Sequence, residues 1–220
     1  MAYWALTGVT AYKPVSVKGI RFMSIAISTR VRLPVILKGD DIVETEIVSY
    51  EGLSSESVAI VFPGTDKQSD TPLVRIHSEC LTGDAFGSAL CDCGPQLREA
   101  KQRIAREGGV LIYLRQEGRG IGLYNKLKAY KLQQDMAMDT FTANRHLGFA
   151  NDMRSYDEAS AMLSALGVSS CRLLTNNPDK VSALEETGIQ VTERVPTGNF
   201  GNAHNSRYLE AKKSHGHFLD

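Results

Sequence analysis

The stretch VRIHSECLTGDAFGSALCDCGPQL, residues 74–97, contains three of the four cysteines in the chain. Cys80 comes first, and Cys91 and Cys93 follow with only Asp92 between them. Thiolates are ligands that zinc prefers, and loops of this length can close Zn–S bonds of about 2.3 Å. Structural zinc sites usually have four protein ligands, whereas catalytic sites have three and leave the fourth position to water. We therefore expect a metal here and favour a catalytic zinc.

Other interpretations of the cysteines stay open at this point. A disulfide would leave one thiol over, and Cys91 with Cys93 could pair only under strain. Cysteines can also act as small hydrophobic residues, although a Gly-rich segment with an Asp is a poor setting for a core. A structural site with four ligands would need His77 or the distant Cys171 as the fourth.

The composition limits the classes of protein to consider. A chain of 220 residues that is 42% hydrophobic can bury one substantial core but not two large domains. Its 25 Lys and Arg balance 25 Asp and Glu, so no overall field indicates nucleic acid or a membrane as partner. We find no apolar run near the ~20 residues of a membrane span and no secretory signal pattern. The expectation is a cytoplasmic protein.

The part of the chain before the cysteines has the pattern of antiparallel strands. Residues 31–37, 42–49 and 57–62 are rich in β-branched residues, partly alternate and are bounded by turn residues. Residues 72–76 are expected to form a further strand that leads into the cysteines. Residues 1–27 show no clear period, and we expect them to be an N-terminal extension of unknown role.

Beyond the cysteines, helical and strand patterns alternate. Residues 110–114 form a continuous apolar run, typical of a strand buried on both faces. We expect residues 171–174 to form a short buried strand and residues 189–195 to form the last strand. We therefore predict a mixed α/β fold within residues 28–220. An antiparallel β portion would come first, followed by alternating helix and strand layers around a mixed sheet in a single domain.

Two local patterns predict how particular helices begin and pack. Ser155 and Glu158 match a capping box, in which each side chain bonds the other's backbone. Leu123, Leu127 and Tyr130 have helical spacing, so Tyr130 could be a core residue as well as a catalytic one.

Two strand-to-helix junctions contain polar groups suited to an anion. The Gly-rich loop 117–122 contains Arg119, and such a loop can place a phosphate at a helix N-terminus, although an ordinary turn explains it equally well. Thr175 ends a predicted strand, and Lys180 falls in the first turn of the next helix. A lysine there opposes the helix dipole, so we expect it to face an anion; a solvated lysine is the alternative.

Asp152 and Arg154 precede a predicted helix and are two residues apart. On the turn ahead of the helix both can point into one cleft. An exposed ion pair is the common alternative.

Together these residues resemble GTP cyclohydrolase II, the zinc enzyme at the start of riboflavin biosynthesis. The segments that carry the resemblance are VRIHSECLTGDAFGS, CDCGPQL, RQEGRGIGLYNKLKAY, DT..AN..LGF..D.R.Y and RLLTNNP.K. It extends from about Arg30 to the C-terminus, and the ordered set is highly specific.

The resemblance implies a role for each matching residue. Cys80, Cys91 and Cys93 would bind one Zn²⁺ per chain. Asp152 matches the family's proposed proton acceptor, Arg154 its proposed nucleophile, and Tyr130 a tyrosine linked with removal of the formyl group. The implied GTP contacts are Arg75, Ile76, His77, Ser78, Glu79, Gln96, Glu117, Gly118, Arg119, Thr140, Thr175 and Lys180.

The implied reaction is hydrolysis of GTP to formate, pyrophosphate and 2,5-diamino-6-ribosylamino-4(3H)-pyrimidinone 5′-phosphate. Mg²⁺ is expected with the triphosphate, and the family implies a homodimer. A guanidinium stays protonated at neutral pH, so Arg154 could act as an electrostatic clamp on the α-phosphate rather than as a nucleophile. Both roles stay open.

The sequence departs from the family pattern at Leu90, where arginine is usual, which removes a positive charge near the metal. Three alternatives are a variant that keeps the formyl group, a non-catalytic GTP-binding regulator and a structural-zinc nucleic-acid module. The presence of Tyr130 disfavours the first, and the cysteines with Asp152 disfavour the second. Zero net charge disfavours the third.

Overall fold

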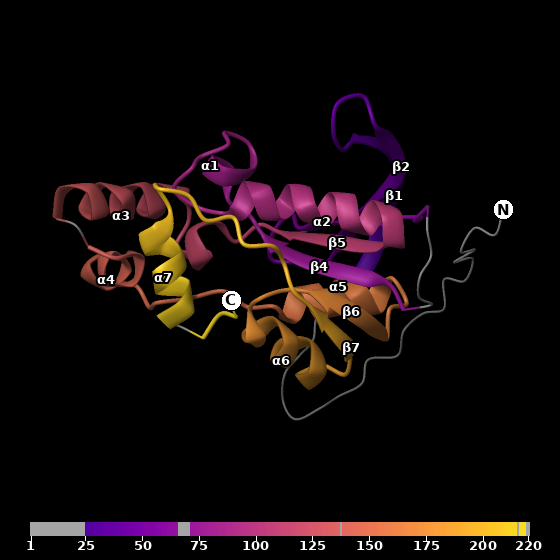
Figure 1. The fold of residues 1–220 in the computed structure, drawn as a ribbon. Helices are drawn as coiled ribbons and strands as arrows, with labels where there is room; N and C mark the ends of the chain where they lie inside the picture. Colours follow the sequence, from indigo (N-terminus) through magenta and orange to yellow (C-terminus); the bar gives the residue numbers. More distant parts are fainter. Residues whose placement is uncertain (1–24, 66–70, 137, 215, 219–220) are drawn as a thin grey trace.

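A computed structural model of the chain describes residues 25–65, 71–136, 138–214 and 216–218 (Figure 1). Most of the expected N-terminal extension, residues 1–24, lies outside the described residues. The last residues of that extension, Ala26 and Ile27, belong to the first strand.

The described residues form a seven-stranded sheet with helices on both faces. The strands are β1 (Ala26–Ile36), β2 (Ile42–Glu51), β3 (Val58–Phe62), β4 (Leu73–Ser78), β5 (Gly109–Leu114), β6 (Ser170–Leu174) and β7 (Gln190–Val195). The α-helices are α1 (Leu81–Asp84), α2 (Cys93–Glu107), α3 (Leu123–Met136), α4 (Thr140–His146), α5 (Asp157–Ala165), α6 (Pro178–Glu186) and α7 (Ser206–Ser214). A 3₁₀ helix, η1 (Glu117–Gly120), precedes α3.

The order of strands across the sheet is β1-β2-β3-β5-β4-β6-β7. The pairs β1–β2, β2–β3 and β3–β5 are antiparallel, whereas β5–β4, β4–β6 and β6–β7 are parallel. The predicted mixed sheet, with an antiparallel portion first and helix–strand alternation after it, is therefore confirmed.

Helices cover the two faces of the sheet with separate core clusters. Ala100 and Ile104 of α2 pack on one face, against Leu111 of β5. Helices α5 and α6 pack on the other face, where Val110 and Ile112 of the same strand point. The continuous apolar run of β5 follows from this arrangement, because a central strand is buried on both sides.

Parallel pairing brings the carboxyl ends of β4, β5 and β6 to one edge of the sheet, where ligands bind in open α/β sheets. Helices α3, α4 and α7 gather beyond this edge (Figure 1), and α4 contacts both of the others. At the opposite end of β5, Gly109 is required, since a Cβ there would lie 1.9 Å from the Leu73 carbonyl oxygen.

Some local predictions were wrong. The capping box forms only in part: Ser155 Oγ accepts from the Asp157 backbone N–H at the start of α5, but Glu158 Oε1 accepts from the Ser54 backbone N–H instead of reaching back. Leu127 is 46% exposed, so the α3 face that it shares with Tyr130 is not core. The short helix α4, capped by Asp139, was not foreseen. The described helices include none with the length and hydropathy needed to cross a membrane.

Candidate active site

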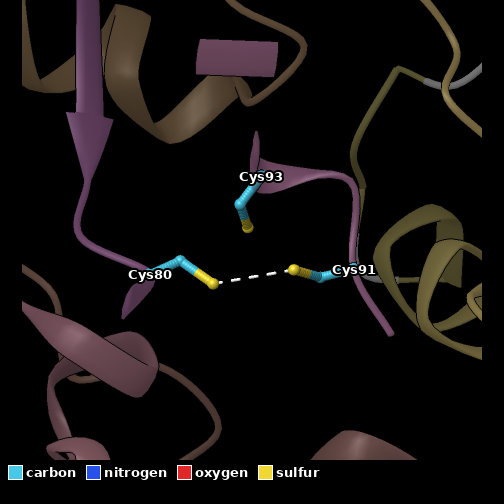
Figure 2. A group of neighbouring side chains, drawn as sticks. All are labelled: Cys80, Cys91 and Cys93. Atoms are coloured by element: carbon cyan, nitrogen blue, oxygen red, sulfur yellow. Dashed lines mark hydrogen bonds between the residues drawn. The ribbon is translucent and has the colours of Figure 1, made fainter. Parts of the chain in front are cut away.

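Three thiols converge near the carboxyl end of β4 (Figure 2). Cys80 follows β4, Cys91 lies in the loop after α1, and Cys93 begins α2. The Sγ atoms of Cys80, Cys91 and Cys93 all lie within 4.8 Å of one another, and Cys80 and Cys91 are 3.6 Å apart. All three are free cysteines, so no disulfide forms among them. Tetrahedral zinc with Zn–S bonds of about 2.3 Å would hold its sulfurs about 3.8 Å apart. The spacing therefore fits a zinc ion.

Close backbone packing allows this convergence. A Cβ at Gly83 of α1 would lie 2.8 Å from Cys91 Sγ and 3.1 Å from Cys80 Sγ. A Cβ at Gly94 would lie 2.3 Å from the Gly83 carbonyl oxygen. Both positions need glycine if the thiols are to come this close, so the two helices meet through residues without side chains.

The two residues considered as a fourth zinc ligand, Cys171 and His77, have other partners. Cys171 belongs to the core cluster between the sheet and α5. His77 Nε2 is 3.1 Å from both Asp84 carboxylate oxygens, and Asp84 also accepts from the Cys80 backbone N–H. Burial lowers the pKa of His77 despite this carboxylate. Among the described residues, the thiols form a three-member set, as a catalytic site requires.

Lys126 of α3 lies directly beside this set. Its Nζ is 3.1 Å from Cys80 Sγ and 2.8 Å from Glu117 Oε1. The pKa of the Cys80 thiol is lowered, because the other two thiols hydrogen-bond to it and the ammonium adds its charge. Lys126 was not among the predicted site residues.

The thiols line a pocket at the carboxyl edge of the sheet. Nearly all the predicted site residues line this pocket: Arg75, His77, Ser78, Glu79, Cys80, Cys91, Cys93, Gln96, Glu117, Gly118, Arg119, Tyr130, Thr140, Arg154, Thr175 and Lys180. Leu90, the departure from the family pattern, lines it too.

Ile76 and Asp152 are not in the lining. The Ile76 side chain is core, and its carbonyl oxygen accepts from Lys180 Nζ at 2.8 Å. Asp152 reaches the pocket through Arg154, whose Nε is 2.9 Å from Asp152 Oδ1. Burial disfavours both charges, but their mutual bonding prevails, so the pKa of Arg154 is raised and that of Asp152 lowered. Both groups are therefore charged at neutral pH.

Buried basic side chains also line the pocket. Lys180 is 6% exposed and has no carboxylate partner among the described residues. Burial and the nearby charges of Arg75 and Arg154 lower the pKa of Lys180 well below its ordinary value. An anion bound here would favour the charged lysine. The alternative of a solvated lysine is thus wrong.

Most of the buried polar side-chain atoms without a partner in the described structure belong to this pocket: Arg75 Nε, His77 Nδ1, Gln133 Nε2 and Thr197 Oγ1. Buried donors and acceptors normally have partners, and leaving one unpaired costs about 1–3 kcal/mol. A polar ligand in the pocket would supply these bonds.

The Gly-rich turn is held in a strained conformation. Arg119 has a φ of 60°, in the left-handed region that favours glycine, and its guanidinium lies 4.2 Å from the Phe141 ring centroid. The Glu117 carboxylate accepts from the backbone N–H groups of Leu81 and Gly118. Glu117 therefore fixes the loop and Lys126, rather than presenting a free carboxylate to a ligand.

Tyr130 faces the pocket rather than the core. Burial raises its pKa to about 12, although the Lys126 ammonium, 5.7 Å from the ring centroid, opposes the shift. The phenol is thus protonated at neutral pH and can donate a proton or a hydrogen bond.

Further residues of the lining were not predicted: Gln116, Ile121, Lys126, Ala129, Gln133, Asn144, Asn176, Asn177, Thr197, Tyr208, Lys212 and His217. Gln116, Lys126, Asn176 and Asn177 lie within the quoted motifs, and their polar side chains there were a usable signal. The C-terminal group (Tyr208, Lys212 and His217) had none, because only the fold brings α7 to this edge.

Comparisons with known proteins agree with this geometry. The family model described as GTP cyclohydrolase II matches residues 35–196. A GTP cyclohydrolase-2 of Vibrio parahaemolyticus is 54% identical over 79% of this chain and 88% of that protein. One of Aliivibrio fischeri is 48% identical over 88% of this chain and 98% of that protein. A riboflavin biosynthesis protein of Vibrio vulnificus is 56% identical over 75% of this chain, but over only 45% of its own length.

Proposed function

Because this chain belongs to the GTP cyclohydrolase II family, we propose that it hydrolyses GTP in the first step of riboflavin biosynthesis. The products are formate, pyrophosphate and 2,5-diamino-6-ribosylamino-4(3H)-pyrimidinone 5′-phosphate. One water is added at carbon 8 of guanine, one at the resulting formamide and one at the α-phosphate. The observation that carries the proposal is a pocket whose lining includes both a three-thiol set that could hold a metal and buried basic side chains.

Cys80, Cys91 and Cys93 would hold one Zn²⁺, for which their spacing is suited. Zinc with an open position supplies a Lewis acid and lowers the pKa of a bound water towards about 7. The side chains around the thiols would balance the charge of the zinc ion and its three thiolates. Lys126 donates to Cys80 and to Glu117, which ties the metal end to the Gly-rich loop.

The basic side chains of the pocket lining would bind the triphosphate. Arg75 and Lys180 are buried, and Arg119 is held by its stacking on Phe141. Fixed positive groups that need not reorganise stabilise charge that develops as pyrophosphate leaves. A Mg²⁺ ion bound with the β- and γ-phosphates would add to this charge; it belongs to the substrate rather than to the protein.

Proton transfers would involve Tyr130 and Asp152. Tyr130 stays protonated, so it can donate to the nitrogen that is released when formate departs. Asp152 is ionised and can accept a proton. The raised pKa of Arg154 argues against a nucleophilic guanidinium and supports an electrostatic contact with the α-phosphate.

The test is incubation of the zinc-assayed protein with GTP and Mg²⁺, followed by measurement of formate, pyrophosphate and the pyrimidine. We expect equal amounts of the three and about one zinc per chain. Cys91→Ser should abolish zinc binding and ring opening together, whereas Cys171→Ala, outside the thiol set, should retain zinc. Turnover by a zinc-free Cys91→Ser protein would disprove the role of the metal.

The variant reaction that keeps the formyl group gives a different product. Tyr130→Phe removes only the hydroxyl, and we expect a formylated pyrimidine to accumulate. Tyr124→Phe is the matched control, because Tyr124 is on the same helix and 79% exposed. An unchanged product ratio in Tyr130→Phe would remove Tyr130 from the deformylation step. GTP binding without turnover in the unaltered protein would favour the non-catalytic regulator.

We also propose that the protein is a homodimer, as the family resemblance implies. Large exposed apolar side chains of α3 (Tyr124, Leu127 and Met136) are of the kind that subunit interfaces cover. Light scattering should give twice the mass of one chain, and the mass of a single chain would contradict the proposal.

A further inference from the structure

The C-terminal helix α7 forms part of the pocket wall, although the family match ends at residue 196, ahead of this helix. Tyr208, Lys212 and His217 of this segment line the pocket. After the helix, the Phe218 backbone N–H donates to the Asn176 carbonyl oxygen at 2.9 Å, and the Arg194 guanidinium lies over the Phe218 ring. The segment is thus attached to the sheet edge at its C-terminal end.

Helix α7 forms a buried ion pair with the segment that contains Cys91 and Cys93. Lys212 Nζ is 2.6 Å from Asp92 Oδ1, and the two residues are 7% and 1% exposed. Asp92 stands between Cys91 and Cys93 and precedes α2 as its N-cap residue, yet its side chain makes no capping bond. An aspartate at this position normally caps its own helix. Here its carboxylate is directed to α7 instead.

The other carboxylate oxygen of Asp92, Oδ2, connects this ion pair through Gln96 to Arg75 of the pocket lining. Gln96 Nε2 donates to Asp92 Oδ2 at 2.7 Å, and Gln96 Oε1 accepts from Arg75 Nη2 at 2.8 Å. A carboxylate only accepts and a guanidinium only donates, so the Gln96 amide can satisfy both neighbours in one orientation alone. Arg75 Nη1 donates to the Leu174 carbonyl oxygen, and Arg75 Nε has no partner within the described part of the chain.

We propose that Lys212 is a positioning residue for substrate binding, acting through Asp92 and Gln96 on the guanidinium of Arg75. The proposal rests on GTP being the substrate of the pocket. Lys212 holds Asp92, Asp92 sets the orientation of the Gln96 amide, and Gln96 fixes the guanidinium that faces the ligand. Without Lys212, Asp92 is a buried charge lacking its counter-ion, which is strongly unfavourable, so the carboxylate and the amide rearrange.

Lys212→Met tests this inference against Lys213→Met. Lys213 is the next residue on the same helix and is exposed, so its replacement removes the same charge from α7 without touching the network. We expect Lys212→Met to raise the KM for GTP at least tenfold with less than a threefold change in kcat and an unchanged zinc content. Loss of an interaction made equally in ground and transition states has this signature. Lys213→Met should stay within twofold of the unaltered protein.

A double-mutant cycle separates positioning from simple packing of the helix. Gln96→Met breaks the connection but leaves Arg75 and α7 in place. In this background, Lys212→Met should add less than a twofold further increase in KM, because its effect passes through Gln96. A packing role would give the same loss in both backgrounds. Additive effects, or a KM in Lys212→Met equal to that of Lys213→Met, would overturn the inference.

A third set of variants covers the case in which Lys212→Met folds poorly. Lys212→Met combined with Asp92→Leu removes both buried charges and the acceptor for Gln96, and should recover the melting temperature that the single change loses. Its KM should stay high, since the carboxylate that orients Gln96 is gone; a normal KM would overturn the inference.

Different results would contradict the proposed hydrolysis of GTP and the positioning role of Lys212. GTP binding without turnover by the unaltered protein contradicts the proposed function, and the dissociation constant of GTP then replaces KM in the cycle. Full turnover with an unaffected Lys212→Met contradicts the inference alone. A protein that neither binds nor hydrolyses GTP overturns both.

Discussion

At the scale of single residues, the site contains charges and polar groups whose partners identify their roles. Lys126 is the clearest case. Three thiolates and Zn²⁺ together carry a net charge of −1, and the ammonium 3.1 Å from Cys80 Sγ balances it. Groups that bond to metal ligands commonly change metal affinity 10–100-fold when they are removed.

Lys126→Met should therefore weaken zinc binding by roughly tenfold, measured by competition with a chromophoric chelator. Lys128→Met is the control, because Lys128 lies on the same helix but is exposed and bonds only Asn125 among the described residues. Equal zinc affinities in the two variants would show that Lys126 stabilises the Gly-rich loop through Glu117 but does not affect zinc binding.

Thr197 makes a second prediction at this scale. Its buried hydroxyl has no partner in the described structure, so Thr197→Val should leave the free energy of unfolding unchanged or raise it. If the hydroxyl bonds the substrate, the KM for GTP should rise about three- to tenfold, the value of one hydrogen bond.

Thr192→Val should behave in the opposite way. The Thr192 hydroxyl donates to the Cys171 carbonyl oxygen and lies outside the pocket lining. This variant should lose about 1 kcal/mol of stability and keep its KM. A normal KM in Thr197→Val would remove that hydroxyl from the binding site.

At the scale of elements, the metal site depends on how closely α1 approaches α2. Gly83→Ala would place a methyl group 2.8 Å from Cys91 Sγ, where it cannot fit without moving a thiol. We expect the zinc content of the purified variant to fall below half of that of the unaltered protein. Ala85→Ser, an exposed change next to the same helix, should bind zinc normally. Full zinc occupancy in Gly83→Ala would mean that the loop can widen.

At the scale of the whole molecule, the core is separate from the proposed metal site. The two buried clusters lie on the faces of the sheet and include none of the three thiols. Removal of zinc with a chelator should therefore leave a cooperatively folded protein with an unchanged far-ultraviolet circular dichroism spectrum. Its melting temperature should fall only by the linkage effect of a lost ligand. Unfolding on chelation, as in zinc fingers, would contradict this.

The C-terminal segment makes the stability of the molecule depend on pH. Burial and the nearby charges of Lys212 and Arg119 lower the pKa of His217 to about 3. The unfolded chain, with an ordinary histidine pKa of about 6.5, takes up this proton first as the pH falls. Stability is therefore full above pH ~6.5 and is lost towards the folded-state value.

Between pH 7 and 5, proton uptake by His217 in the unfolded chain should lower the free energy of unfolding by up to about 2 kcal/mol. In His217→Gln that part of the loss should disappear, as measured by urea unfolding at the two pH values. His204→Gln, at an exposed histidine, is the control. An equal pH dependence in His217→Gln and the unaltered protein would contradict the assignment.

Local chemistry in the sequence determined the class of the fold and most of the site. Apolar runs such as 110–114 predicted buried strands, since burial on both faces demands continuous hydrophobicity. The spacing of the three cysteines and the preference of zinc for thiolates predicted a metal site, because thiolates close together in the chain can reach one metal. The adjacent motifs identified most of the pocket lining, and those after β4, β5 and β6 follow directly from the end of a strand.

Only the tertiary structure decided which distant groups meet. Glu158 bonds Ser54 rather than its own helix, since a backbone N–H from 104 residues away is close enough to compete with the local cap. Lys212 gives no signal in sequence, and it reaches Asp92, 120 residues earlier, because parallel strands bring their carboxyl ends to one edge and α7 packs there. Local energies fix the elements, whereas partners distant in sequence are fixed by the free energy of packing the whole chain.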